Sequence, residues 1–465
     1  TKLVHGGVRY LAQGNVPLVT EALHERSRLL HNAPHLARPL AFVMPAYQWW
    51  EVPFYGIGLK MYDLLAGSHG LGRTEFLSRH ETLRCLPGVQ ARGLVGGVKY
   101  WDGQFDDARV ALALARTAAA QDALLVNHCP VDGLIHDDGK VAGVVCEDRE
   151  TGRLLSVRAR CVVNATGVWV DGVRAMDGDA LGHPVRPMVA PSQGVHLVVD
   201  AEFLPGDHAL LVPKTRDGRV LFAVPWMGKL ILGTTDTPRH DLALEPEPFA
   251  HEVAFILNES ARYLRRPPQR TDVRSCWVGL RPLVKAPEAG EEDTKALSRE
   301  HTVLISHSGL VTVTGGKWTT YRSMAEDVLR KCMTENLLPH RSGGVTRHQM
   351  LVGADKTIPT QAPLGNPGAL QPYGSEAAAV LALPGAQRQL GGGLTEAMVR
   401  FAARHEYART VEDVLARRVR LLFLDARLAG SLAPQVGAIL AQETGRDPEI
   451  AAFEALAAKY LLLPA

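Results

Sequence analysis

Glycine stands next to charged or aromatic residues in four segments, which are the first candidates for chemistry: residues 1–11, 233–236, 279–283 and 315–322. Segment 315–322 is the most informative. Gly315 and Gly316 stand between a predicted strand and a predicted helix, so backbone N–H groups there can approach a ligand closely, and the start of the helix favours negative charge on that ligand. A tight turn with a solvated Lys317 explains the same pattern equally well.

Several cations in or near these segments could bind a phosphate or a carboxylate together: Arg9, Arg281, Arg299 and Lys317. The planar guanidinium forms two hydrogen bonds with such an anion, although each cation alone would be an ordinary surface residue. His5 and His196 are candidate bases, because histidine titrates near neutral pH. A structural hydrogen bond is the competing interpretation for each of the 18 histidines.

Composition narrows the class of protein. A length of 465 residues predicts two or three substructures, and a net charge of +2 argues against a protein that binds nucleic acid or a membrane surface through its overall field. The six cysteines include no C-x-x-C pair, which favours a reducing compartment and no metal site. No uncharged apolar run approaches the ~18 residues of a membrane span.

The first part of the chain alternates helices and strands. Asn15 and Pro17 predict the start of a helix that ends near Pro34, and Asp106 predicts the start of another that runs to about Asp122. Short β-like runs at 133–136, 141–147 and 154–159 predict an antiparallel meander. The apolar run 161–167 predicts a strand buried on both faces. The expected class is therefore mixed α/β with an antiparallel insertion.

A second sheet is predicted after residue 185, led by strands at 195–199 and 220–224 and by a hairpin turn at 226–228. A helix at 248–264 and strands near 273–278, 302–305 and 310–313 follow, and Thr319 or Thr320 would cap the next helix. Thr410 and Asp413 predict a capping box. We expect two interleaved subdomains in 1–335, a linker at 336–374 and a helical domain at 375–465, which could begin as early as 345.

The dinucleotide fingerprint G-x-G-x-x-G is absent from the position where it is expected, after the first strand of a nucleotide-binding domain. Gly56 and Gly58 continue to Met61 instead of a glycine, within a helix-like pattern. Residues 67–72 have the wrong spacing, and residues 391–393 lie in the predicted helical part. We reject all three as fingerprints.

Taken in order, these segments resemble the FAD-dependent, quinone-linked glycerol-3-phosphate dehydrogenases of the D-amino-acid-oxidase-like flavoprotein superfamily. Residues 1–11 are similar to the family segment S-K-L-x-H-G-G-x-R-Y-L, with Thr1 in place of Ser. Further similar segments are 163–169, 225–236, 279–283, 298–299, 315–322 and, in the helical part, 410–427. The family's N-terminal strand, G-x-G-x-x-G turn and helix are missing before Thr1, so the chain resembles a fragment, a mis-started gene product or a divergent relative.

The resemblance implies an FAD-binding Rossmann-like domain interleaved with an antiparallel-sheet substrate domain, plus an all-helical C-terminal domain. It implies oxidation of sn-glycerol 3-phosphate to dihydroxyacetone phosphate by hydride transfer to FAD, with electrons passed to a quinone. A glycerol-3-phosphate oxidase that uses oxygen, another member of the superfamily acting on an amine or hydroxy acid, and an inactive, cofactor-free remnant are the alternatives.

The resemblance also implies roles for single residues. The catalytic group would be His5, His196, Arg281 and Lys317, with one of the two histidines as the base. The substrate would contact Arg9, Tyr10, Thr234, Arg281 and Arg299. FAD would contact Thr1, Lys2, Leu3, Gly6, Gly7, Val131, Thr166, Gly167, Trp169, Gly316, Lys317, Trp318 and Thr319.

The expected partners are glycerol 3-phosphate, a quinone and a second copy of the chain, with no nucleic acid and no metal. The expected location is cytoplasmic or peripheral on the inner face of the cell membrane. The apolar residues near Lys60, from Phe54 to about Leu65, would provide the membrane contact.

Overall fold

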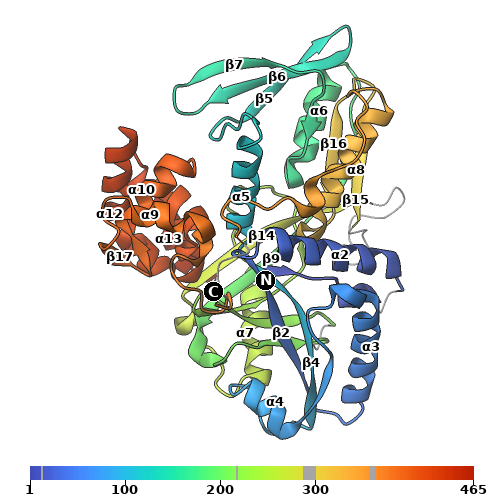
Figure 1. Cartoon of the computed structure of the whole chain (residues 1–465), viewed down its shortest axis with the longest axis vertical. Helices are drawn as coiled ribbons and strands as arrows, with labels where there is room; N and C mark the ends of the chain where they lie inside the picture. Colours follow the sequence, from blue (N-terminus) through green and yellow to red (C-terminus); the bar gives the residue numbers. More distant parts are fainter. Residues whose placement is uncertain (12–13, 216–217, 286–299, 356–361, 465) are drawn as a thin grey trace.

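The computed structural model describes residues 1–11, 14–215, 218–285, 300–355 and 362–464 (Figure 1). These residues form a ten-stranded sheet, a three-stranded sheet, an antiparallel meander and a C-terminal group of helices. The large sheet contains β1 (Leu3–Val4), β4 (Gly96–Phe105), β2 (Ala37–Ala46), β10 (Ala209–Val212), β11 (Leu221–Trp226), β12 (Lys229–Gly233), β9 (Val189–Asp200) and β13 (Thr237–Pro238) in that order, with β14 (Ser275–Val284) on β9 and β3 (Glu75–Ser78) on β4.

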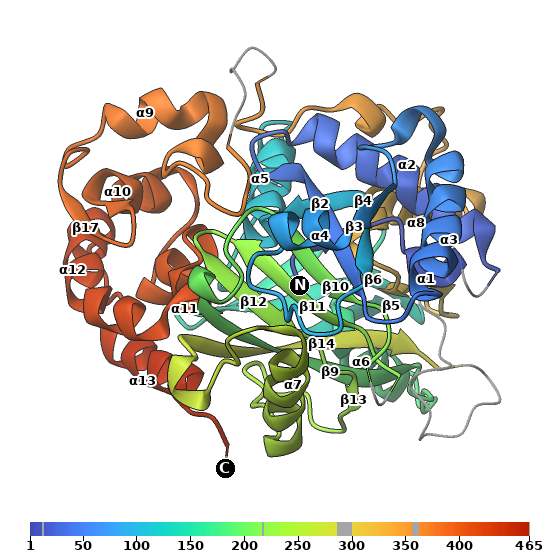
Figure 2. The same cartoon turned by 90° about the horizontal axis from the view of Figure 1, so that it is seen from below.

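Both faces of the large sheet are buried around β9. Val195, Leu197 and Val199 point into one core together with residues of α7 (Ala250–Tyr263), which packs on that face (Figure 2). Val198 points the other way and joins Trp277 in the core of the C-terminal helices. Because side chains alternate along a strand, the run 195–199 can contribute to both cores, since His196 is its one polar residue.

The hairpin predicted at 226–228 is confirmed. Strands β11 and β12 are antiparallel neighbours, and Met227 and Gly228 between them both have positive φ, 49° and 79°. That geometry is typical of a two-residue turn whose twist matches the strands. The turn places Gly233 at the end of β12, opposite His196.

The strand predicted at 161–167 is wrong in length and in burial. Strand β8 spans only Val163–Asn164 and pairs in parallel with β16 (Val311–Gly315), which pairs in turn with β15 (His301–Ile305). One edge of β8 therefore has no strand beside it among the described residues, and the Val163 side chain is 42% exposed. An apolar run is buried on both faces only where other elements pack on both.

The helices and meander predicted in the first part are confirmed. Asn15 accepts a hydrogen bond from the backbone of Leu18 at the start of α2 (Val16–Asn32), and Asp106 accepts one from Arg109 at the start of α5 (Asp107–Ala119). The meander consists of β5 (Val131–Asp137), β6 (Lys140–Asp148) and β7 (Arg153–Arg158), and projects away from the large sheet (Figure 1). The other helices of this half are α1 (Val8–Leu11), α3 (Glu51–Ala66), α4 (Arg79–Cys85), α6 (Val170–Ala180) and α8 (Tyr321–Thr334).

The C-terminal helices pack around their own apolar core. They are α9 (Ala377–Leu381), α10 (Glu396–His405), α11 (Leu421–Leu424), α12 (Ala426–Thr444) and α13 (Ile450–Leu461), with a π-helical turn at Asp413–Arg418. Thr410 and Asp413 exchange the two hydrogen bonds of the predicted capping box. A buried ion pair of 2.9 Å joins Arg109 of α5 to Glu406 and anchors these helices on the rest of the chain. The proposed domain boundaries stay a prediction.

Candidate functional site

His196 lies in the large sheet between two strands that restrict its imidazole ring. In β9 it is paired with Gly233 of β12 on one side and with Trp277 of β14 on the other. The Trp277 ring stacks on the imidazole, with ring centroids 4.2 Å apart and planes 18° apart. A Cβ at Gly233 would come within 2.4 Å of the imidazole Cδ2, so glycine is required there.

The environment of His196 keeps its ring neutral. Burial lowers its pKa well below the ordinary value, and the positive charges of Lys2 and Arg281 act in the same direction. Its Nε2 lies 2.8 Å from the backbone nitrogen of Thr1. Its Nδ1 is buried and has no hydrogen-bond partner among the described residues. A neutral imidazole can accept a proton.

Arg281 lies on the same face of the sheet as His196. Its guanidinium covers Gly194, where a Cβ would come within 2.2 Å of Nη2. Gly194 and His196 are two residues apart in β9, so the guanidinium and the imidazole are separated by about 7 Å along the strand. One small molecule could therefore place a phosphate on the guanidinium and another of its groups, a few bonds away, on the imidazole.

Arg281 is oriented by the loop that follows β12. Its Nη2 donates to the Thr235 carbonyl at 3.1 Å and to Oγ1 of Thr234 at 3.3 Å, and its Nη1 lies 3.4 Å from Oδ1 of Asp236. The side chain keeps 28% of its surface exposed, so part of the cation faces outward from these contacts. Arg281 and Thr234, both predicted to bind substrate, are thus in direct contact.

Glu252 of α7 fixes the same loop from behind. Its carboxylate is fully buried and accepts hydrogen bonds from Thr235 at 2.8 Å, from Thr237 at 2.6 Å and from the side-chain amide of Gln193. Thr235 in turn accepts one from the backbone of Val195. One buried carboxylate therefore links α7, β9 and the loop that holds Arg281.

Lys2 lies next to His196 and is held by α5. Its ammonium donates to Asp107 at 2.6 Å and lies 4.7 Å from the centre of the Trp277 ring. Burial lowers the pKa of Lys2, and Asp107 opposes that shift. Burial would raise the pKa of Asp107, but Lys2 and Arg420 outweigh it and hold that pKa below its ordinary value. Arg420 comes from the C-terminal helices, 3.3 Å from Asp107.

The glycine segments 1–11 and 315–322 meet. Oγ1 of Thr319 donates to the His5 carbonyl at 3.4 Å. Gly315 and Gly316 have φ of 77° and 73°, and a Cβ would come within 2.7 Å of the Glu300 carbonyl at the first and within 2.6 Å of the Met324 sulfur at the second. Backbone conformation and packing thus both require glycine here. The Trp318 ring is half-exposed and packs edge-on against Phe105.

Gly6 is committed to contacts within the protein. Its N–H donates to the Tyr62 hydroxyl at 2.9 Å and points toward Asp102 at 3.3 Å, and Asp102 forms a buried ion pair with Arg26. A Cβ at Gly6 would come within 2.4 Å of the Tyr62 oxygen. The need for glycine at this position therefore comes from packing against α3.

The other predicted cofactor residues lie around the small sheet. The Gly167 carbonyl accepts a hydrogen bond from Thr314 at 3.3 Å, which joins the turn after β8 to the strand before Gly315. Thr166 bonds Asn164, and Trp169 donates to the Leu242 carbonyl. Val131 is the first residue of β5. Arg299 lies outside the described residues, as do the side chains of Arg9 and Tyr10, whose backbone belongs to α1.

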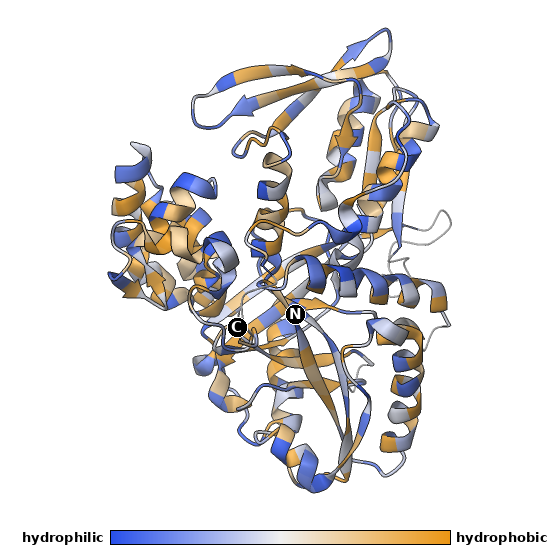
Figure 3. Ribbon diagram, in the orientation of Figure 1, coloured by the Kyte–Doolittle hydropathy of each residue, from blue (hydrophilic) through white to orange (hydrophobic). Residues whose placement is uncertain are grey.

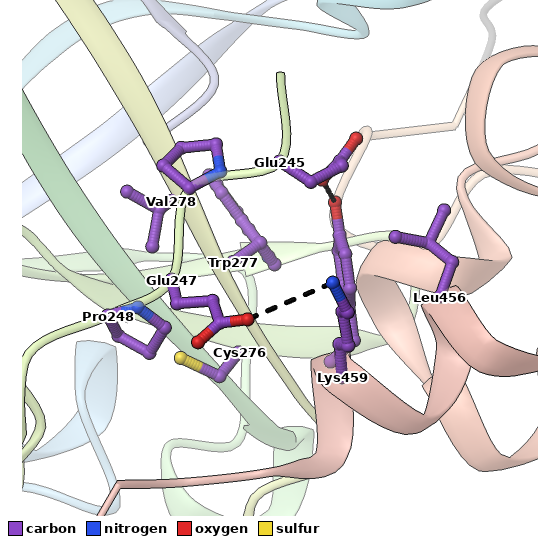
Figure 4. A pocket seen from close by; sticks show the side chains of 10 residues that line it. Glu245, Glu247, Pro248, Cys276, Trp277, Val278, Leu456 and Lys459 are labelled. Atoms are coloured by element: carbon purple, nitrogen blue, oxygen red, sulfur yellow. Dashed lines mark hydrogen bonds and ion pairs between the residues drawn. The ribbon is translucent and has the colours of Figure 1, made fainter. Parts of the chain in front are cut away.

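Two hollows border these residues. A cavity of about 580 Å³ lies between α5, Trp318 and the C-terminal helices, where Arg417, Arg418 and Arg420 line it together with acidic Asp107 and Asp413. A slot of about 20 Å³ lies beside Trp277, between residues 245–248 and α13 (Figure 4). Tyr460 closes the slot by a 3.0 Å hydrogen bond to Glu245.

Three important residues escaped the sequence analysis: Trp277, Glu252 and Asp107. Trp277 stands two residues before the 279–283 segment, and Asp107 directly follows the helix cap Asp106, so both were next to recognised signals. Glu252 carried no local signal beyond its place in the first turn of a helix.

Comparison with known proteins identifies the family. The family model described as "FAD dependent oxidoreductase" matches residues 1–322, and the one described as "C-terminal domain of alpha-glycerophosphate oxidase" matches residues 345–450. The chain belongs to the FAD-dependent glycerol-3-phosphate dehydrogenase family. It has the fold of an oxidoreductase family whose cofactor is FAD.

The chain is 40% identical over 482 residues to the mitochondrial glycerol-3-phosphate dehydrogenase of Rattus norvegicus, covering 95% of this chain but 64% of that protein. It is 39% identical over 485 residues to the mitochondrial glycerol-3-phosphate dehydrogenase of Arabidopsis thaliana, covering 95% of this chain and 76% of that protein. The chain thus spans less than two thirds of the length of the rat relative.

Among solved structures, the glycerol-3-phosphate dehydrogenase from Bacillus halodurans complexed with FAD superimposes with a TM-score of 0.75 at 25% identity. The match covers 100% of this chain and 87% of that one. The predicted fold class, with its mixed α/β body and helical C-terminal part, is confirmed by this match.

The residues of this chain fit the flavin-ring end of FAD. Two of the predicted FAD contacts suit a bound ring: a side chain added at Gly167 would meet open space, and Gly316 has the positive φ of a glycine turn. The buried Nδ1 of His196, a predicted catalytic residue, has no partner among the described residues. For the pyrophosphate end the printed sequence contains no G-x-G-x-x-G turn. The fit to FAD therefore rests on the flavin-ring end.

Proposed function

We propose that this family member oxidises the C2 hydroxyl of sn-glycerol 3-phosphate to dihydroxyacetone phosphate. The observation that carries the proposal is the alignment of Arg281 and His196 on one face of β9 and β14, about 7 Å apart along the strand. A three-carbon phosphate ester is long enough to contact both. The names of the rat and Arabidopsis relatives support the same substrate.

Arg281 binds the phosphate through its guanidinium fork, and Thr234 and Asp236 set the direction in which the fork points. Arg299, Arg9, Tyr10 and Lys317 are further proposed contacts of the substrate. His196 accepts the proton of the C2 hydroxyl, because its low pKa keeps the imidazole neutral. His5 is the alternative base. FAD, when bound, supplies the two-electron acceptor.

The test is anaerobic mixing of the FAD-loaded protein with sn-glycerol 3-phosphate, followed by the absorbance of oxidised flavin. We expect bleaching with this substrate and little with glycerol, which has no phosphate, or with a hydroxy acid. Bleaching by a hydroxy acid or an amine instead would replace the substrate assignment. Failure of the purified protein to retain or take up FAD would support the inactive remnant.

We further propose that the electrons pass to a quinone in a membrane that the chain touches with α3. The apolar side chains Phe54, Ile57 and Leu64 of this helix are 65%, 62% and 80% exposed, and apolar residues recur along the helix (Figure 3). Their spacing puts them on one face, which suits a helix lying in a lipid interface. No helix of the described residues is long and apolar enough to cross a membrane.

Binding to liposomes tests this contact. Leu64→Glu should weaken co-sedimentation of the FAD-loaded protein with lipid vesicles and slow reduction of a lipid-soluble quinone, while flavin reduction by substrate stays unchanged. Equal binding of wild type and variant would remove α3 from the proposal. The inner-face location and the homodimer stay predictions of the family resemblance.

An oxidase that uses oxygen is the second candidate, because the model that matches residues 345–450 is named after alpha-glycerophosphate oxidase. The two candidates differ in the reoxidation step. Rapid reoxidation of the reduced flavin by oxygen, with one peroxide released per turnover, would favour the oxidase. Slow reaction with oxygen and fast reaction with a quinone would favour the dehydrogenase.

A further inference from the structure

Four aromatic rings form a continuous row from the candidate base to the C-terminal helices. The His196 and Trp277 centroids are 4.2 Å apart, those of Trp277 and Phe423 are 5.5 Å apart, and those of Phe423 and Tyr460 are 5.5 Å apart. The first two rings belong to the large sheet, and the last two belong to α11 and α13. All four are buried.

Polar contacts hold the last two rings of the row, Phe423 and Tyr460, in place. The Tyr460 hydroxyl donates to Glu245 at 3.0 Å, and the neighbouring Lys459 lies 3.9 Å from Glu247 (Figure 4). The Arg420 guanidinium lies 4.0 Å from the centre of the Phe423 ring. Phe423 is thus held between Trp277, Tyr460 and a cation, and cannot leave Trp277 without loss of these contacts.

His196 needs a group that sets the angle of its ring. A histidine that acts as a base is usually oriented by a hydrogen bond from the nitrogen that does not react. Here Nε2 lies 2.8 Å from the Thr1 nitrogen and Nδ1 has no partner among the described residues, so a single polar contact at the ring edge and packing on the ring together set the angle. The Trp277 ring covers one face of the imidazole. The backbone of Gly233, on the neighbouring strand β12, lies close to the imidazole and limits movement of the ring in that direction.

We propose that Trp277 is a positioning residue for His196, and that the C-terminal helices fix it through Phe423. The proposal rests on the proposed function, in which His196 is the base. Trp277 stands directly across from His196 in the β9–β14 pair, so the two side chains share a face of the sheet as direct cross-strand neighbours. The helical domain thereby becomes part of the active site without contacting the substrate.

The charged groups beside His196 are Lys2 and Arg281, and both are present in every variant of the test. Lys2 lies over the Trp277 ring and is also held by Asp107, and Trp277→Phe keeps an aromatic ring beneath it. A titration that shifts in Trp277→Leu but not in Trp277→Phe therefore reports ring position and water access. A purely structural tryptophan would change stability without changing that titration.

The test compares Trp277→Leu, Trp277→Phe and Phe423→Leu in the FAD-loaded chain. We expect Trp277→Leu to lower kcat about 10- to 100-fold, with KM for sn-glycerol 3-phosphate changed less than about twofold, because a misaligned base slows the chemical step. Trp277→Phe keeps a flat ring and should recover most of kcat. Phe423→Leu should give a smaller loss in the same direction.

The second readout is NMR of histidine labelled at Cε1, with the His196 signal assigned by its loss in His196→Gln. In Trp277→Leu this signal should titrate at higher pH than in wild type. Wild-type kcat and an unchanged titration in Trp277→Leu would overturn the proposal, as would a kcat in Trp277→Phe equal to that of Trp277→Leu. If wild type fails to oxidise the substrate while the titration still shifts, the proposed function fails and the positioning contact stands.

Discussion

The large sheet and the small sheet carry different halves of the candidate site, and the two sheets differ in how many neighbouring strands and buried side chains stabilise them. In the large sheet, β9 has strands on both edges and cores on both faces, and Val195 and Val198 are fully buried. In the small sheet, β8 has one neighbouring strand within the described part of the chain, and Val163 is 42% exposed. The apolar Leu124 and Val126 between α5 and β5 are 90% and 62% exposed.

This difference indicates which site residues are held in place by contacts within the protein. His196 and Arg281 are held by the ten-residue pairing of β9 with β14, by Glu252 and by Trp277. Thr166, Gly167 and Trp169 follow a strand of two residues. We therefore expect substitutions in the large sheet to change catalysis and stability strongly, and substitutions around β8 to act mainly on cofactor retention.

The largest expected difference is kinetic. His196→Gln removes the base and should slow flavin reduction by sn-glycerol 3-phosphate about 10²- to 10⁴-fold in FAD-loaded protein, measured by anaerobic stopped flow. Thr166→Ala in the small-sheet region should leave that rate close to wild type once FAD is bound. A Thr166→Ala rate as slow as that of His196→Gln would reverse the comparison.

A matched pair of valines tests the stability of the two sheets. Val198→Ala deletes two buried methyl groups and should lower the free energy of unfolding by about 2–3 kcal/mol. Val163→Ala lies on an open edge and should change it by less than about 0.5 kcal/mol. Urea unfolding of both variants measures the difference, and equal losses would mean that β8 is as well supported as β9.

The pH dependence of the unfolding free energy tests burial next to the large sheet, because His35 is buried just before β2. Burial lowers the pKa of His35 to about 4 in the folded protein. The unfolded chain binds that proton at higher pH, so the stability is complete above about pH 6.5 and is lost as pH falls toward 4, by up to about 1.4 kcal/mol per pH unit. His35→Gln should flatten the unfolding free energy over this range, and an unchanged slope would contradict the burial.

The smallest effect is expected at Glu252, which acts through the loop that holds Arg281. In Glu252→Gln one oxygen becomes an amide donor and can no longer accept the hydrogen bonds from Gln193 and Phe249. We expect KM for sn-glycerol 3-phosphate to rise about 10-fold with kcat nearly unchanged, because phosphate binding weakens. A loss in kcat alone, with KM unchanged, would separate Glu252 from the phosphate.

Local signals predicted much of this molecule. Asn15 and Asp106 cap their helices, Met227 and Gly228 form the predicted hairpin, and Thr410 exchanges its predicted bonds with Asp413. These features depend on neighbours in sequence, so the sequence was enough. The site residues Arg281 and His196 were proposed from their types within glycine-rich segments.

The features that the sequence did not predict depend on contacts between residues far apart in the chain. The run 161–167 is apolar, yet its burial depends on elements that pack against it, and β8 has one neighbouring strand among the described residues. Trp277 meets His196 only because β14 pairs with β9, and Asp107 meets Lys2 across 105 positions. Pairings of this kind leave no periodic pattern in the sequence.

The central claim is that the large sheet builds a phosphate site around Arg281, and its most direct test is kcat/KM for sn-glycerol 3-phosphate in FAD-loaded Arg281→Ala and Arg281→Lys. Loss of a charged hydrogen bond to the phosphate should cost Arg281→Ala about 2–4 kcal/mol, or roughly 30- to 1,000-fold, with flavin content unchanged. Arg281→Lys should recover part of that loss, because it keeps the charge without the fork. A wild-type kcat/KM in Arg281→Ala would contradict the account and place the phosphate elsewhere.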